Sequence, residues 1–360
     1  MDADHTIRVG TVNVQRFASD ARFEAFVASL DMLKCDVVGV SETARKGKTA
    51  VNLVNSQWSY YNGGPSATAP SGTGFFVNQR VIKRVRQYKM VSDRISYLDI
   101  EASGSEVLRL VQVYAPCSSH SIAEYEDFLD SLSAVLALRL PVQRMSRHRN
   151  LRTILLGDFN AKVGMQENGE ERYVGLFGYG NRNDQGDRLI DFCVQSTMQI
   201  RDTYFFMKKN KRWTWRAPNL AALNKIDYVL VPCRYAHIIR DLTVYRHIDY
   251  DTDHRLIMIR IKIGGKRLPQ RRRHKKRVLD HQLYEQTLND IQINPQASVN
   301  EQYNAIVGQM KQAAKSSMTD EQPFYLKEAK EERHRAYVSK AVENRKSVKK
   351  ALLRTKTTTK

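Results

Sequence analysis

Cysteine is scarce in this chain of 360 residues and shows no clustering. The four cysteines, Cys35, Cys117, Cys193 and Cys233, lie far apart, without a C-x-x-C pair and without histidines at a zinc-site spacing. A disulfide framework or a structural zinc site needs such clusters, so the sequence argues against both. We therefore expect a protein of a reducing compartment.

Long apolar runs and targeting signals are also missing. No stretch approaches the ~18 apolar residues of a membrane span, and the first residues, MDADHTIRVG, lack the basic and apolar regions of a signal peptide. We expect an intracellular protein that is not secreted and has no membrane partner. The cluster RRRHKKR (271–277) suits either a nuclear-localisation signal or a phosphate contact. A nuclear or nucleocytoplasmic location is the corresponding prediction.

Acidic residues are too few to balance the basic ones. Lys and Arg number 58 against 38 Asp and Glu, which gives a formal net charge of +20. Residues 262–360 hold 23 of the basic and only 10 of the acidic residues, so the C-terminal part carries most of the excess. An excess of this size favours a polyanionic partner, either nucleic acid or an anionic membrane surface.

Short apolar, β-branched runs alternate with helical patterns through residue 263. Seven runs are predicted strands: 7–14, 36–42, 72–78, 107–116, 152–161, 225–232 and 255–263. Amphipathic helices are predicted at 23–33, from Ser121, and at about 184–196. Ser121 and Glu124 form the S-x-x-E pattern of a capping box. This mixture indicates one α/β or α+β domain with helices covering the sheets.

The pattern changes after residue 263. Residues 264–277 are predicted to be a basic linker, and 278–360 a basic extension, helical or partly disordered and without a convincing strand. Residues 320–354 resemble a long charged helix. Such a helix is either a solvated surface, a nucleic-acid clamp or a connector, and the sequence leaves these alternatives open.

Polar residues gather where the predicted strands end. The segment LLGDFNA (155–161) ends an apolar run on Asp158 and Asn160, which lie two apart and therefore on one face of a strand. The other strand-end residues are Asn13, Glu42, Tyr114, Asp227, Asp253 and His254. Each alone has an ordinary structural explanation, such as a turn or a helix cap.

Together these residues suit the hydrolysis of a phosphodiester. Such a site must neutralise the phosphate oxygens, activate a water and assist the leaving oxygen. A Mg²⁺ ion prefers one or two carboxylates, which Glu42 with Asn13 beside it supplies. We hypothesise that Asp158 orients or deprotonates the water and that Asn160 and His254 donate to the phosphate. In the same hypothesis Asp227 orients His254 and raises its affinity for a proton, and Tyr114 or a metal-bound water supports the leaving oxygen.

The ordered series Asn13, Glu42, VYAP (113–116), GDFNA (157–161), KIDYVL (225–230) and TDH (252–254) resembles the endonuclease/exonuclease/phosphatase superfamily. This superfamily includes abasic-site endonucleases, pancreatic deoxyribonuclease, deadenylases, inositol-phosphate phosphatases and retrotransposon endonucleases. The resemblance covers about residues 6–263. Six motifs in one order are far more specific than any one of them.

Within this superfamily, residues 176–206 and 212–230 are similar to the endonuclease domains of LINE-type (non-LTR) retrotransposons and the related craniofacial development protein group. The resemblance implies an α+β fold, a four-layer α/β sandwich of two mostly antiparallel sheets packed face to face and covered by helices. It further implies an endonuclease domain over 1–263, dependence on Mg²⁺ (Mn²⁺ as a substitute) and nicking of DNA, with low sequence specificity and 3′-hydroxyl ends. Residues 278–360 are then expected to resemble the connector to a reverse transcriptase.

The resemblance also assigns roles residue by residue. The metal residues are Glu42 and Asn13, and the catalytic residues are Asp158, Asn160, His254, Asp227, Tyr114 and Asp253. Two departures from the family pattern concern Val12, where a Trp is frequent, and Gln15, where some members have a carboxylate. The second departure leaves Glu42 as a more isolated metal ligand.

Three further residues are candidate substrate contacts. Trp213 and Trp215 lie two apart, so that one suits a wedge against DNA bases and the other suits core packing. Arg182 and Asn183 precede the third predicted helix and either contact the phosphate backbone or cap that helix. We predict Trp215, Arg182 and Asn183 as substrate-binding residues.

Two other functions remain as alternatives. One is a phosphatase or phospholipid hydrolase on the same fold, since a fold does not determine the substrate. The other is a domesticated or inactive nuclease that acts as a nucleic-acid-binding module. The filled catalytic positions favour the enzyme.

Overall fold

The computed structural model describes residues 6–17, 19–45, 48–53, 56–63, 71–103, 106–140, 150–219, 221–245, 248–263, 277–279, 286, 299–316 and 318–320. Its contacts divide the chain into two compact units, Met1–Lys266 and Arg267–Lys360. The predicted linker from residue 264 lies, up to residue 276, outside the described residues. The division into an endonuclease domain (1–263), a basic linker (264–277) and a basic extension (278–360) therefore stays a prediction.

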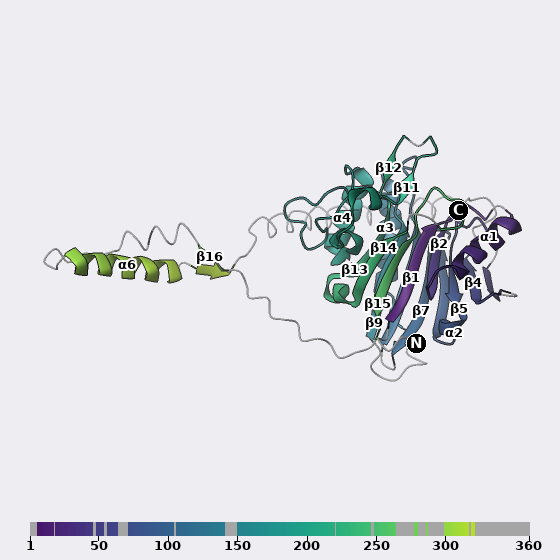
Figure 1. The fold of residues 1–360 in the computed structure, drawn as a ribbon, viewed down its shortest axis with the longest axis horizontal. Helices are drawn as coiled ribbons and strands as arrows, with labels where there is room; N and C mark the ends of the chain where they lie inside the picture. Colours follow the sequence, from purple (N-terminus) through teal and green to yellow (C-terminus); the bar gives the residue numbers. More distant parts are fainter. Residues whose placement is uncertain are drawn as a thin grey trace, which may run out of the picture. The chain divides into compact units, whose positions relative to one another are not determined.

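The first unit is built on two sheets (Figure 1). The seven-stranded sheet has the order β14 (Ile239–Val244), β15 (Ile257–Lys262), β1 (Thr6–Asn13), β2 (Val37–Ser41), β5 (Thr73–Asn78), β4 (Trp58–Gly63) and β3 (Lys48–Asn52). The six-stranded sheet has the order β10 (Met198–Ile200), β13 (Asp227–Pro232), β9 (Asn150–Asp158), β8 (Glu106–Tyr114), β7 (Ile95–Ser103) and β6 (Val85–Ser92). A short hairpin joins β11 (Trp215–Arg216) to β12 (Leu223–Asn224).

An apolar core lies between the two sheets. Val9, Val37 and Val77 from the larger sheet pack in one buried cluster with Leu110 and Ile154 from the smaller sheet. Alternate residues of β15 enter this cluster, as the isoleucine pattern of 257–263 indicates. Burial of these side chains removes apolar surface from water and holds the sheets face to face.

Helices cover the outer faces. On the larger sheet, α1 (Asp20–Asp31) buries Phe23, Phe26 and Leu30, and Ser19 caps its start by accepting from the Arg22 amide. On the smaller sheet, α3 (Ile122–Ala137) and α4 (Asp184–Gln195) bury one face each in a third cluster. The predicted capping box of α3 is present, with Ser121 and Glu124 each bonding the other's backbone. The helix α2 (Gln79–Ile82) and the 3₁₀ helices η2 (Arg201–Tyr204), η3 (Lys209–Lys211) and η4 (Cys233–Ile238) complete this unit.

The predicted four-layer α/β sandwich is confirmed, with helix, sheet, sheet and helix in succession. Both sheets are mostly antiparallel, and each contains one parallel pair, β1 with β2 and β8 with β9. All seven predicted strands occur. In the two large sheets, the sequence pattern missed the strands β3, β4, β6, β7, β10 and β14.

In the second unit, the described residues form α6 (Val299–Ser316) and a hairpin-like pair of β16 (Arg277–Leu279) and β17 (Met318–Asp320). The expectation that no strand follows residue 278 is therefore wrong, because Leu279 of β16 pairs with Met318 of β17. Most of the predicted charged helix at 320–354 lies outside the described residues. None of the described helices is long and apolar enough to cross a membrane.

The two parallel pairs place the strand ends of both sheets together. Asn13 pairs with Ser41, so β1 and β2 end at the same level, and Tyr114 likewise pairs with Asp158. The strand β13 runs against β9, so its first residue, Asp227, lies opposite Asp158. Because parallel strands end on the same side of a sheet, the polar residues predicted at these ends meet at one edge of the sandwich.

Gly157 lies inside β9 and is not the turn residue that the GD dipeptide indicates. Its φ of 136° is a conformation that side chains disfavour, and a Cβ there would lie 2.3 Å from the Val113 carbonyl oxygen. This glycine lets β8 approach β9 closely at the residue before Asp158. It therefore contributes to the position of that carboxylate.

Replacement of Gly157 by alanine should destabilise the first unit by about 2–4 kcal/mol, because strain and a backbone clash add together. Gly180 is the control: its φ is also positive, at 70°, but a Cβ there meets nothing within 4 Å. Gly180→Ala should lower the free energy of unfolding by only about 1–2 kcal/mol. Urea unfolding followed by tryptophan fluorescence measures both, and equal losses would contradict the proposed clash.

Candidate active site

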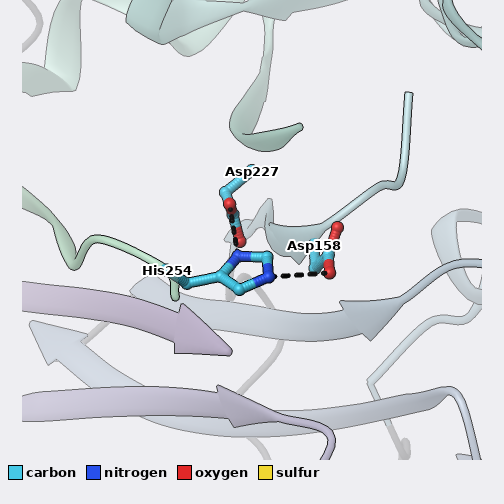
Figure 2. Close-up of side chains that lie close together, drawn as sticks. All are labelled: Asp158, Asp227 and His254. Carbon is cyan, nitrogen blue, oxygen red and sulfur yellow. Dashed lines mark hydrogen bonds and ion pairs between the residues drawn. The ribbon is translucent and has the colours of Figure 1, made fainter. Parts of the chain in front are cut away.

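His254 and Asp227 form a buried pair. His254 lies just before β15, Asp227 begins β13, and the imidazole Nδ1 lies 2.9 Å from the Asp227 Oδ2 atom. The other ring nitrogen, Nε2, faces Asp158, with 3.9 Å between Nε2 and Oδ2 (Figure 2). The imidazole thus lies between two carboxylates from neighbouring strands of the smaller sheet.

Asn13 links the carboxylates of the two sheets. Its Nδ2 atom donates to Glu42 Oε2 at 3.0 Å and to Asp158 Oδ2 at 3.0 Å. Its Oδ1 atom accepts from the backbone N–H of Gln15, which fixes the Asn13 side chain with its nitrogen toward the carboxylates. Asn13 therefore bridges Glu42 and Asp158. Its role as a metal residue stays a prediction.

Asn160 and Glu42 have unusual backbones. Their φ angles are 48° and 58°, in the left-handed region that non-glycine residues seldom adopt. The Asn160 amide group donates to the Ala115 carbonyl at 2.8 Å, and its backbone N–H donates to Asp158 Oδ1 at 2.9 Å. Since the side-chain amide has two N–H donors, one remains for a phosphate oxygen.

Tyr114, Asp253 and Trp215 also lie at this edge. Tyr114 is beside Asp158 in register. Asp253 Oδ2 accepts from the Trp215 indole at 2.9 Å, and its Oδ1 lies 3.8 Å from His254 Nε2. Trp213 precedes β11 and stacks with the Arg255 guanidinium, so the two tryptophans do not share a strand. Contact of Trp215 with substrate stays a prediction.

Arg182 and Asn183 have structural roles. The Arg182 guanidinium bonds both carboxylate oxygens of Glu170 and the carbonyls of Val163 and Met165. Asn183 caps α4 by accepting from the Gly186 amide, the alternative that the sequence left open. Their predicted contact with substrate gains no support from this geometry.

Two threonines that sequence reasoning missed orient the site. Thr214 is buried, and its hydroxyl oxygen accepts from the backbone N–H groups of Ile226 and Asp227, at 3.1 Å each. Thr252 donates to the Asn13 carbonyl at 2.8 Å and accepts from the His254 amide. These bonds hold the Asp227 backbone to Thr214, and the His254 backbone to Thr252 and Asn13. The sequence around the two threonines, WTW and DTDH, has no feature that predicts these bonds.

Burial and neighbouring charges alter the acid–base properties of the site. Burial, and then the charge of Asp227, raise the pKa of Asp158 to about 7, although His254 and the Asn13 amide oppose them. Burial lowers the pKa of His254, but the charge and hydrogen bond of Asp227 outweigh it and raise the pKa to about 9. Burial and the charges of Glu42 and Asp158 raise the pKa of Tyr114. At neutral pH His254 is thus a proton donor and Asp158 is close to the ideal range for a base.

The donor set fits a hard divalent cation. The site gathers carboxylates on Glu42, Asp158, Asp227 and Asp253, and oxygen ligands are those that Mg²⁺ and Mn²⁺ prefer. Buried carboxylate oxygens of Asp227 and Asp253 have no hydrogen-bond partner among the described residues. Asp158, Asp227 and His254 also lie close enough together to hold a metal ion. In that group, however, Asp227 is already hydrogen-bonded to His254. Glu42 is therefore the better candidate for an ion.

Residues 10–254 match the endonuclease/exonuclease/phosphatase family, and the chain belongs to that family.

The individual proteins that resemble this chain share less than a third of its residues. The chain is 27% identical over 262 residues to craniofacial development protein 2 of Tragulus javanicus, a match that covers 73% of this chain and 43% of that protein. The chain thus spans less than half the length of this relative. Among solved structures, the AP endonuclease LMAP of Leishmania major has a TM-score of 0.55 at 15% identity, over 73% of this chain and 90% of that one. The endonuclease domain of TRAS1, a telomere-specific non-LTR retrotransposon, has a TM-score of 0.49 at 14% identity, over 72% and 100%.

Asp227 should control the titration of His254. In chelator-treated protein, the imidazole NMR signal should have its midpoint near pH 9. Asp227→Asn should move it at least about one pH unit lower, because the neighbouring charge is removed. The folded-state pKa lies above the ordinary 6.5, so the stabilisation by this pair is complete below pH 6.5 and is lost as the pH rises through about 9.

The matched control for this titration is Asp251→Asn, since the Asp251 side chain is 98% exposed in the same segment. The control should leave the midpoint unchanged. An unshifted midpoint in Asp227→Asn would contradict the role of that carboxylate.

Proposed function

We propose that this chain is a Mg²⁺-dependent DNA endonuclease that hydrolyses phosphodiester bonds. The observation that carries the proposal is the buried His254–Asp227 pair facing Asp158, with Glu42 held to the same carboxylate through Asn13. A protonated imidazole, a carboxylate with a pKa near neutrality and an oxygen-rich acidic site suit phosphate chemistry in a family of nucleases and phosphatases.

The net charge of the chain supports DNA as the substrate. The formal charge of +20 suits a polyanion, since each neutralised phosphate releases counterions and strengthens binding. The resemblance of residues 176–206 and 212–230 to LINE-type endonuclease domains supports nicking with low sequence specificity. A nuclear or nucleocytoplasmic location would suit this substrate.

Asp158 is the proposed base. Its Oδ1 atom accepts from the backbone N–H of Asn160 and its Oδ2 from the side-chain amide of Asn13, so the carboxylate is fixed before substrate arrives. It takes a proton from water as the water oxygen bonds to phosphorus and the phosphorus–O3′ bond breaks. Fixed geometry of this kind lowers the entropic cost of bringing the reacting groups together.

His254 and Asn160 stabilise the phosphate. Protonated His254 donates from Nε2, because Nδ1 is held by Asp227, and Asn160 donates its second amide hydrogen. Donors aimed at the oxygens where charge develops contribute most in a buried site. The Tyr114 hydroxyl, protonated at neutral pH, is the proposed proton donor to the O3′ leaving oxygen. A Mg²⁺ ion held by Glu42 would supply further charge neutralisation when bound.

Replacement of Asp158 by asparagine should reduce nicking of supercoiled plasmid at least about 100-fold, because the base is lost while the shape is kept. His254→Ala should reduce it by about 100-fold or more through loss of a phosphate donor. The assay compares Mg²⁺ with chelator, and Asp251→Asn serves as an exposed control. Normal turnover by Asp158→Asn would refute the assignment. Tight DNA binding without nicking by the wild type would favour a binding module. Release of phosphate from inositol or lipid substrates would favour a phosphatase.

Replacement of Glu42 by glutamine should mainly change the metal requirement. The Mg²⁺ concentration for half-maximal nicking should rise by about tenfold or more, because the variant loses the ligand charge. Glu24→Gln, on the exposed side of α1, is the control. An unchanged Mg²⁺ dependence in Glu42→Gln would show that the ion is held elsewhere.

A further inference from the structure

Two exposed apolar side chains flank η2, whose Thr203 carbonyl accepts from the Phe177 backbone N–H. Phe206 is 73% exposed and Leu176 is 67% exposed, whereas large apolar side chains in this unit are mostly buried. The Phe206 ring contacts the Phe177 ring edge to face, with 5.5 Å between their centroids. Exposed apolar groups gathered in this way mark a binding surface more often than isolated ones do.

Basic residues continue this apolar surface along the chain. Lys208, Lys209 and Lys211 are exposed, and none of them forms an ion pair within the described part of the chain. Arg212 places its guanidinium over the Phe177 ring at 5.3 Å and donates to the Gly178 carbonyl. We call Leu176, Phe177, Phe206, Lys208, Lys209 and Lys211 the Phe206 surface.

The segment that carries the three lysines is anchored to residues next to the active site. Arg255 follows His254, and its guanidinium stacks on Trp213 and donates to the Asn210 carbonyl between the lysines. The segment that carries these lysines then continues through Thr214, which holds the Asp227 backbone. A strand of nucleic acid bound at the site would therefore have the lysine segment beside it, and Phe206 two residues before Lys208 in the chain.

The combination of groups selects one kind of partner. Aromatic rings with adjacent lysines bind unpaired nucleic-acid strands, because bases stack on the rings and phosphates meet the ammonium groups. A duplex hides the faces of its bases, and an apolar protein partner would leave three lysines without counter-charges. We propose that the Phe206 surface binds an unpaired stretch of DNA next to the phosphodiester that is cut. This rests on the proposed nuclease function and specifies its substrate as DNA with a duplex–single-strand junction.

The test is DNA binding in the presence of chelator, measured by fluorescence anisotropy with the full chain. The probes are a blunt duplex and the same duplex with a 3′ or a 5′ unpaired extension. Wild type should bind one extended probe more tightly than the blunt one. Phe206→Ala should weaken binding to that probe by about 5- to 100-fold and change blunt-duplex affinity less than about twofold.

Two further variants make the test specific. Met32→Ala removes an apolar side chain that is 80% exposed at the end of α1, and should bind all probes as wild type does. A combined Lys208→Gln, Lys209→Gln and Lys211→Gln variant should reduce the salt dependence of binding to the extended probe, because fewer counterions are released.

The binding assay separates the two proposals. If wild type fails to nick but Phe206→Ala still loses affinity for the extended probe, the surface is supported and the nuclease function is not. If wild type nicks DNA but Phe206→Ala binds every probe normally, the Phe206 surface proposal is overturned. Equal weakening toward blunt and extended DNA would also overturn it, since stacking on unpaired bases would not be the cause.

Discussion

The site depends on one side-chain amide at the junction of two sheets. Asn13 ends β1 in the larger sheet. Its nitrogen lies 3.0 Å from Glu42, which follows β2 of that sheet, and 3.0 Å from Asp158 of the smaller sheet. Two carboxylates brought together repel each other unless a donor or cation lies between them. Asn13 supplies a neutral donor to both carboxylates. The backbone N–H of Gln15 and the hydroxyl of Thr252 hold Asn13 in place.

The sandwich makes this junction possible because it combines mostly antiparallel sheets with one parallel pair in each. The parallel pairs bring the ends of β1 and β2, and of β8 and β9, to the same edge. Antiparallel β13 and β15 then begin at that edge and deliver Asp227 and His254. The apolar clusters between and outside the sheets fix these strands, so that side chains from both sheets meet with little freedom.

Short apolar runs that end on polar residues predicted seven strands and the residues at their ends, and the family resemblance predicted the four layers. Sequence reasoning missed strands such as β6, where exposed Arg86 and Lys89 interrupt the apolar pattern of a sheet edge. It also missed the roles of Thr214 and Thr252, and the hydrogen bonds that Asn13 donates to both carboxylates. Those roles depend on hydrogen bonds between residues far apart in the chain, and the residue types alone do not specify them.

The most direct test of this account is the Mg²⁺ dependence of single-turnover plasmid nicking by Asn13→Ala. If one amide aligns both carboxylates, the variant needs more Mg²⁺ for half-maximal rate, because Glu42 is misplaced, and is also slower at saturating Mg²⁺, because Asp158 is misplaced. A variant with only one of these defects, or with neither, would contradict the claim that Asn13 holds the two halves of the site together.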